Sequence, residues 1–175
     1  MKSGKMRDYN NIEIIYDRYA KSLYNTSLRI VKDSFKAEEI MQDTIIRYSK
    51  ESKATHLDNP GGWLQRVCVT KSIDYLRKTK RENIFLTEFA QDNKTVSTNP
   101  EPDRHRIEPV TKAKEIKEAI YNLPDKYRIV LSLLLLEGYD YEEVAEITKA
   151  PASTVRSWMI RGKQLVIETL QNRKS

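Results

Sequence analysis

The chain has a single cysteine, Cys68, among its 175 residues. One cysteine excludes a disulfide framework within the chain and a metal site built from several cysteines, and it fits a reducing compartment. Cys68 stands in an apolar stretch, so we expect it to be a small core residue, with a redox switch as the alternative.

Long apolar runs are also missing. The longest, Ile129–Leu136, includes Ser132 and is far too short to span a bilayer. The first 20 residues carry Asp8, Glu13 and Asp17 and lack the apolar segment of a signal peptide. We therefore expect a cytoplasmic protein without membrane insertion.

Residues that would serve catalysis or cofactor binding are scarce. The two histidines, His56 and His105, stand apart in loop-like segments, and no phosphate-binding GxxxxGK[ST] loop occurs. We therefore predict no enzyme activity, no cofactor and no metal site.

Glycine is rare, with five in the chain. Together with the small number of alternating apolar–polar runs, this favours an all-α fold over one with strands. Asp33 or Ser34 can cap the second helix, and Gly138 is suited to end the fifth. Apolar residues recur at helical spacing over residues 10–31, 34–49, from Gly62 or Trp63 to about Arg81, 111–122, 125–137, and in a pair of helices within 141–163.

The composition changes at residue 82. Residues 82–110 contain three prolines, six acidic residues and three basic ones, a formal charge of −3. A loop this long inside one compact domain is unusual, so we interpret it as an extended acidic linker. The prediction is two small helical domains, residues 1–81 and 111–175, joined by the linker 82–110.

Positive charge is concentrated in two segments. The net charge of the chain is +6, from 31 Lys and Arg against 25 Asp and Glu. Residues 66–82 contribute a net +4 and residues 149–175 a net +5. Two basic patches on either side of an acidic tether suggest two contacts with one nucleic acid, although a solvated helix end would explain either patch alone.

The segment 141–163, YEEVAEITKAPASTVRSWMIRGK, has the pattern of a helix-turn-helix, which lays its second helix in the major groove of DNA. Ala145 stands where two helices would cross closely, and Pro151 begins the second helix. The turn carries Lys149 where glycine is common, so a positive φ is expected on a non-glycine residue. Inward packing is expected for Val144, Thr148, Ala150, Val155 and Trp158. The alternative is a plain helical hairpin with a solvated basic face.

The predicted second helix has an acidic face. Glu39 and Asp43 are four residues apart and share a side of the helix, with Gln42 beside them. This surface would repel phosphate, so it suits a basic protein better than DNA. An ordinary solvated helix face is the alternative interpretation.

Three segments together resemble the extracytoplasmic-function (ECF) group of bacterial sigma factors. They are KAEEIMQDTIIRY (36–48), NPGGWLQRVCVTKSIDYLRK (59–78) and LPDKYRIVLSLLLLEGYDYEEVAEITKAPASTVRSWMIRGKQL (123–165). They occur in the family's order, with a short tether in place of a region 3 domain. The resemblance covers nearly everything except the tether and the ends, and it implies sigma regions 2 and 4.

The resemblance also implies roles for residues of region 2. Glu39, Gln42 and Asp43 match the surface that docks on the β′ clamp helices of core RNA polymerase. The segment after Pro60 matches the −10 reader, in which the preceding loop, here about 52–62, captures a base flipped from the non-template strand. Trp63 is either a stacking platform or a core residue, and many relatives carry Asn at the position of Thr70. The matching helix surface holds Trp63, Arg66, Thr70, Lys71 and Asp74.

Region 4 is implied to read the −35 duplex and to meet the polymerase β flap. Arg156 and Arg161 are candidates for guanine or phosphate contacts, whereas Lys149 and Lys163 are candidates for phosphate alone. Trp158 stands where relatives commonly have arginine, and we expect it to pack inward. The groove-facing positions of the family match Thr154, Arg156, Ser157, Ile160 and Arg161.

The implied function is a bacterial transcription initiation factor. It would bind core RNA polymerase, direct it to promoters through their −10 and −35 elements, and help open the DNA. An anti-sigma factor is an expected further partner. The rival is a stand-alone helix-turn-helix regulator that binds duplex DNA without polymerase and uses its N-terminal half for dimerisation or a ligand.

Overall fold

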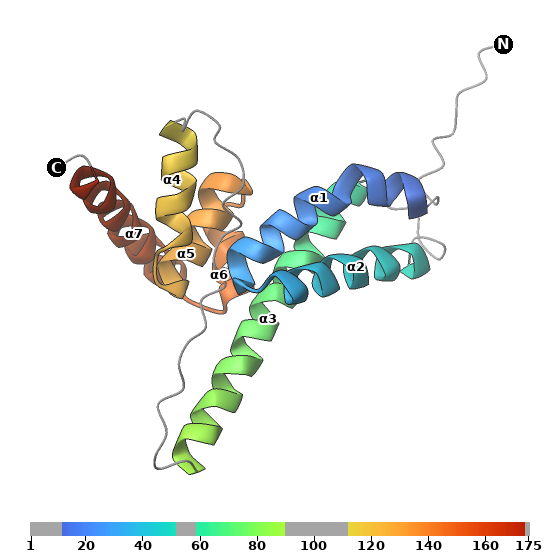
Figure 1. Ribbon diagram of the computed structural model, residues 1–175, viewed down its shortest axis with the longest axis horizontal. Coiled ribbons are helices and arrows are strands. Elements are labelled where there is room, and N and C mark those ends of the chain that lie inside the picture. Colours follow the sequence, from blue (N-terminus) through green and yellow to red (C-terminus); the bar gives the residue numbers. More distant parts are fainter. Residues whose placement is uncertain (1–11, 52–58, 90–111, 174–175) are drawn as a thin grey trace. The chain divides into compact units, whose positions relative to one another are not determined.

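The computed structural model describes residues 12–51, 59–89 and 112–173, and every regular element in these ranges is a helix (Figure 1). This confirms the all-helical prediction. The chain divides into two compact units, residues 1–78 and 79–175, and each is described by itself. None of the described helices is both long and apolar enough to cross a bilayer.

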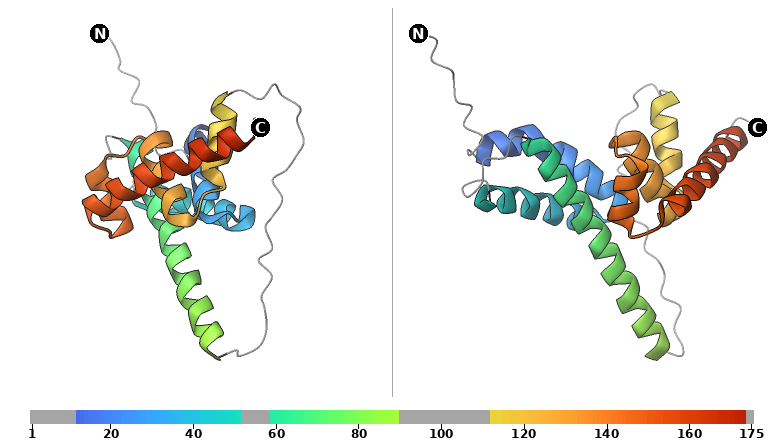
Figure 2. Two further views of the ribbon diagram at one scale, coloured as in Figure 1. Left: turned by 90° about the vertical axis from the view of Figure 1, so that its left-hand side faces the viewer. Right: turned by 180° about the vertical axis from the view of Figure 1, so that it is seen from behind.

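The first unit is built on α1 (Ile12–Val31), α2 (Ser34–Glu51) and the first part of α3 (Pro60–Phe89). A two-residue link joins α1 to α2, so the two helices run antiparallel and lie side by side (Figures 1 and 2). The buried residues at the heart of the unit come from all three helices: Ile15, Leu23 and Ile30, Ile40 and Ile45, and Leu64, Val69 and Ile73. Cys68 is fully buried among them, and its thiol donates to the carbonyl of Leu23 at 3.4 Å, as expected of a core residue.

Side-chain caps set where α2 and α3 begin. The backbone N–H of Lys36 donates to Oδ1 of Asp33 at 2.9 Å, so Asp33 is the residue that caps α2. Asn59 does the same for α3, accepting the N–H of Gly62 at 3.0 Å. The third helix therefore begins at Pro60, two or three residues before the predicted start at Gly62 or Trp63, because a proline is tolerated directly after a cap.

The other end of α3 is also later than expected. The helix continues to Phe89, so the first eight residues of the predicted linker, 82–89, are helical. No glycine or proline occurs between residues 82 and 99, and a shift in charge alone does not stop a helix. The remainder of the predicted linker, 90–110, lies outside the described residues.

The second unit contains α4 (Lys112–Tyr121), α5 (Asp125–Leu131), a π-helical turn η1 (Ser132–Leu136), α6 (Tyr141–Thr148) and α7 (Ala152–Asn172). The long helix α7 packs against α4, α5 and α6 (Figure 2). The predicted helix over 125–137 is α-helical only as far as Leu131, and then widens into η1. Gly138, with φ +78°, ends it as expected.

A buried arginine secures the turn between α4 and α5. Arg128 is 2 % exposed, pairs with Asp125 at 2.8 Å and donates to the carbonyl of Leu123 at 3.3 Å. Burial by itself would raise the pKa of Asp125, but the cations of Arg128 and Lys80 together outweigh it, so the pKa of that carboxyl lies below its ordinary value. The ion pair thus closes the turn between α4 and α5.

Candidate polymerase and nucleic-acid interfaces

The helix-turn-helix pattern folds as predicted. Asp140 and Glu143 form a reciprocal capping box at the start of α6, with backbone-to-side-chain hydrogen bonds of 2.8 and 2.9 Å. The turn runs through Lys149, whose φ of 53° and ψ of 37° are left-handed, as the pattern led us to expect. Pro151 directly precedes α7 instead of occupying its first position.

The residues of α6 and α7 that we expected to pack inward are buried or half-buried. Val144 and Val155 are completely buried, while Thr148, Ala150 and Trp158 are half-buried. Sequence reasoning missed three buried residues of α7, Met159, Gly162 and Val166. Gly162 would have been hard to find, because a lone glycine within a helix gives no indication of a close crossing.

The outer side of α7 carries the candidate −35 residues. Arg156, Ser157, Ile160 and Arg161 are all exposed, as is Lys163, and Thr154 is half-buried. Positions 153, 156, 157, 160 and 161 recur at three- and four-residue intervals, so they share one helix face. Ile160 is 63 % exposed, and an exposed aliphatic group on this face can contact a thymine methyl in the major groove.

Weak local contacts hold these polar side chains. Arg156 lies 3.4 Å from a carboxylate oxygen of Glu142 and 5.5 Å from the ring centre of Tyr141, both at the start of α6. Arg161 reaches Oε1 of Gln164 at 3.3 Å. Exposed contacts of this kind contribute at most about 1 kcal/mol, so both guanidinium groups can exchange them for a base or phosphate.

The candidate −10 residues lie along the first half of α3. Arg66, Thr70 and Asp74 are exposed, while Trp63 and Lys71 are half-buried. Thr70 donates its hydroxyl to the Arg66 carbonyl at 2.8 Å, and Asp74 pairs with Arg77 at 2.9 Å. Residues 52–58, most of the loop expected to capture a flipped base, lie outside the described residues.

Trp63 packs against α2 while keeping part of its ring accessible. Its ring meets that of Tyr48 edge-on, with centroids 5.7 Å apart and planes at 61°. The Arg47 guanidinium lies 5.9 Å from the Trp63 ring centre. Trp63 is therefore anchored on one side and half-exposed on the other, and its role as a stacking platform stays a prediction. Arg47, which sequence reasoning did not select, adds a cation beside it.

The acidic face of α2 is exposed, but its charges have partners within the unit. Glu39 pairs with Lys36 at 2.7 Å, and the Gln42 amide donates to Glu38 at 3.2 Å. Asp43 pairs with Lys71 of α3. The last contact brings a candidate docking residue together with a candidate −10 residue, a proximity that no local sequence pattern indicates.

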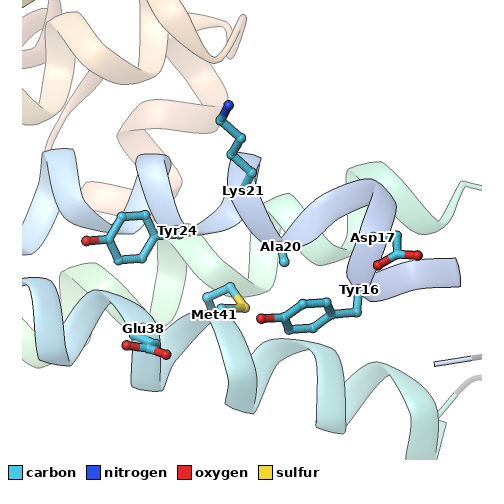
Figure 3. Close-up of a pocket in the computed structure, with 7 residues that line it drawn as sticks. All are labelled: Tyr16, Asp17, Ala20, Lys21, Tyr24, Glu38 and Met41. Atoms are coloured by element: carbon cyan, nitrogen blue, oxygen red, sulfur yellow. The ribbon is translucent and has the colours of Figure 1, made fainter. Parts of the chain in front are cut away.

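A shallow cavity of about 460 Å³ lies beside this face, between α1 and α2. Figure 3 shows the seven residues that line it: Tyr16, Asp17, Ala20, Lys21, Tyr24, Glu38 and Met41. Glu38 joins the cavity to the acidic face, because it accepts the hydrogen bond from Gln42. Among the described residues, no group of three His, Cys, Asp or Glu side chains is placed to hold a metal ion.

Comparison with known proteins agrees with this arrangement. Residues 15–82 match the family model for Sigma-70 region 2, and residues 113–166 match the model for Sigma-70, region 4. The chain is 26% identical to the ECF RNA polymerase sigma factor SigW of Bacillus subtilis, over 98% of this chain and 95% of that protein. It is 27% identical to SigM of the same organism, over 93% and 96% of the two chains.

A solved structure shares the fold. The sigma factor RpoE of Bartonella quintana, crystallised with the anti-sigma factor NepR, superposes with a TM-score of 0.61 at 19% identity. The match covers 93% of this chain and 98% of that one. The two-domain helical architecture is therefore the architecture of a known sigma factor.

Proposed function

Because this chain belongs to the ECF group of RNA polymerase sigma factors, a family of polymerase-binding initiation factors, we propose that its two units divide promoter recognition between them. The first unit would dock on polymerase and engage the −10 element, and the second would read the −35 duplex. The observation that carries this division is the separation of the two family matches, region 2 at 15–82 and region 4 at 113–166.

The docking surface of the proposal is the exposed acidic face of α2. Glu39, Gln42 and Asp43 occupy one side of that helix and would meet basic residues of the β′ clamp helices. Electrostatic complementarity of this kind guides association and fixes the register of the two proteins. Lys36 and Lys71, which neutralise the face in the free protein, would be displaced by the cations of the partner.

The −10 step of the proposal uses α3. Flipping a base out of a duplex costs a few kcal/mol, and stacking on an aromatic ring returns about 1–3 kcal/mol per base. Trp63 offers a half-exposed ring for such a stack, while Arg66 and Lys71 supply positive charge for the adjoining backbone. Thr70 and Asp74, exposed on the same helix, would contact bases or sugars.

The −35 step of the proposal uses the outer face of α7. Arg156 and Arg161 would donate to guanine or phosphate, and Thr154 and Ser157 to base edges. Ile160 would contact a thymine methyl. Lys149 in the turn and Lys163, both exposed, would fix the helix in the groove through phosphate without reading sequence.

The rival function, a regulator that binds duplex DNA without polymerase, is not favoured. It leaves the region 2 match over residues 15–82 without a role. Further partners follow from membership of the family: the polymerase β flap for the second unit, and an anti-sigma factor. We expect no catalytic activity of the chain itself, and action in the cytoplasm alongside RNA polymerase.

The proposal is tested by transcription in vitro. Purified chain and core RNA polymerase are incubated with a library of genomic fragments, and the transcripts are sequenced. We expect initiation at a restricted set of sites that share two elements with a fixed spacing. Transcripts that start at the same sites with and without the chain would show that it is not a sigma factor.

The docking face has its own test. Charge reversal by Glu39→Lys together with Asp43→Lys should weaken assembly with core polymerase by at least about tenfold, because close charge pairs across an interface would become repulsive. The matched control is Glu13→Lys with Asp17→Lys, which makes the same change in net charge on exposed positions of α1. Equal assembly of both variants would contradict the docking assignment.

A further inference from the structure

Asp43 and Lys71 belong to two different proposed surfaces, yet their side chains form an ion pair across α2 and α3. The two residues are 28 positions apart in the chain. The Asp43 side chain is 60% exposed and that of Lys71 is 27% exposed. The carboxylate is therefore open to an incoming partner, while the ammonium lies closer to the body of the unit.

Neighbouring contacts bridge the same two helices. Lys36 of α2 lies 5.0 Å from the ring centre of Tyr75 on α3, and Arg47 of α2 lies 5.9 Å from the ring centre of Trp63. The Asp43–Lys71 pair lies between these two along both helices. At this position along α2 and α3, an anion of the proposed docking face, Asp43, contacts a cation of the proposed −10 surface, Lys71.

This position gives the pair a consequence for DNA binding. In the free protein, the Asp43 carboxylate holds the Lys71 ammonium, so a DNA phosphate has to compete with it for the same cation. A polymerase cation that pairs with Asp43 removes this competition. The Lys71 ammonium is then available to a phosphate.

We propose that the Asp43–Lys71 pair couples polymerase docking to DNA binding by the first unit. Docking at Asp43 releases Lys71, so DNA binds more tightly to the assembled complex than to the free chain. Coupling between two binding sites is reciprocal, so DNA held by Lys71 also strengthens docking at Asp43. The inference rests on the proposed function of the two surfaces and adds the link between them.

The size of the coupling is bounded by the exposure of the pair. An exposed ion pair corresponds to at most about a fivefold change in affinity. The effect is therefore a modest bias toward the assembled complex, and high salt reduces it further.

The first test uses the free full-length chain and a fluorescein-labelled single strand of mixed-sequence DNA, about 20 nucleotides long, with binding followed by anisotropy. Asp43→Asn should raise the affinity about two- to fivefold, and Lys71→Gln should lower it by a similar factor. In the double variant the gain from Asp43→Asn should disappear. A gain that persists without Lys71 would overturn the coupling.

The matched control is Asp17→Asn, which removes one negative charge from an exposed position on α1 of the same unit. Its effect on DNA affinity should be clearly smaller than that of Asp43→Asn. An equal effect would mean that net charge, and not the pair, governs binding.

The second test compares the free chain with the polymerase complex. Lys71→Gln should cost a larger factor in DNA affinity when core polymerase is bound at saturation, because docking frees the ammonium. An equal factor in both states would overturn the coupling while leaving the docking assignment intact. Failure of the unaltered chain to assemble with core polymerase would instead overturn the proposed function.

Discussion

At the scale of single residues, Gly162 decides how closely two helices of the second unit approach. A Cβ at this position would lie 2.5 Å from Cδ1 of Leu131 and 3.3 Å from Cβ of Tyr127. Leu131 is 1 % exposed, so it has little room to move aside. The absence of a side chain at 162 is therefore part of the contact between α7 and α5.

We expect Gly162→Ala to destabilise the second unit. Alanine favours a helix by about 1 kcal/mol over glycine, but overpacking a filled core costs about 1–3 kcal/mol. The net loss should be at most about 2 kcal/mol, measured by urea denaturation. In a Leu131→Ala background the loss should shrink, since the obstructing methyl group is gone. An equal loss in both backgrounds would show that the contact is not the cause.

Arg156 is the residue at which base reading can be separated from phosphate binding. Arg156→Ala should cost about 1–3 kcal/mol in promoter affinity if the guanidinium makes a bidentate base contact. The measurement is binding of the polymerase complex to promoters with altered −35 bases. A loss that is the same for every −35 sequence would restrict Arg156 to phosphate.

The matched control for Arg156 is Arg173→Ala near the end of the same helix. Arg173 is exposed and pairs with Glu118 at 3.4 Å, much as Arg156 pairs with Glu142. The control therefore removes the same charge and a similar ion pair, away from the face that we assign to the groove.

At the scale of elements, the turn between α4 and α5 should respond to acid. Because the pKa of Asp125 is lowered in the folded state, its stabilising effect is complete above the ordinary value of 3.8 and is lost as the pH falls through the lower folded pKa. Urea denaturation near pH 5 and near pH 3 should show a smaller acid loss in Asp125→Asn than in the unaltered chain. The opposite order would contradict the assigned direction of the pKa.

Helix positions were predicted well from the sequence, because most of their signals are local. Asp33, Gly138 and the turn at Lys149 fell where their residue types led us to expect. The errors occurred where two local signals compete. Asn59 caps α3, but the two glycines after Pro60 favoured a later start in the sequence-based prediction. The acidic composition after residue 82 favoured a linker, although α3 continues to Phe89.

The cross-helix contacts could not be predicted in the same way. The Asp43–Lys71 pair depends on how α2 and α3 are aligned in space, and the sequence places the two residues in separate motifs. The widening at Ser132–Leu136 arises in an apolar run that is equally compatible with an ordinary α-helix. The exposed faces of the candidate sites were predictable, whereas their internal partners were not.

At the scale of the whole molecule, the division into two units predicts independent folding. A protease site introduced near residue 95 should give two fragments that both stay soluble and helical after cleavage. Each should keep its own thermal transition, followed by circular dichroism. A single transition that is lost on cleavage would mean that the two units fold as one domain.

The left-handed backbone of Lys149 opposes the phosphate contact that we propose for its side chain. A side chain in this conformation costs about 1–2 kcal/mol, a strain that glycine would relieve, and glycine would at the same time remove a positive charge from the turn. Selection of this chain for heat resistance alone would therefore favour glycine at position 149, whereas the proposed phosphate contact predicts that selection for promoter binding would restore lysine. In a laboratory evolution experiment on this protein, we expect substitutions that exchange thermal stability for promoter affinity to occur at position 149. This position lies in the turn between α6 and α7, outside both the core and the recognition helix.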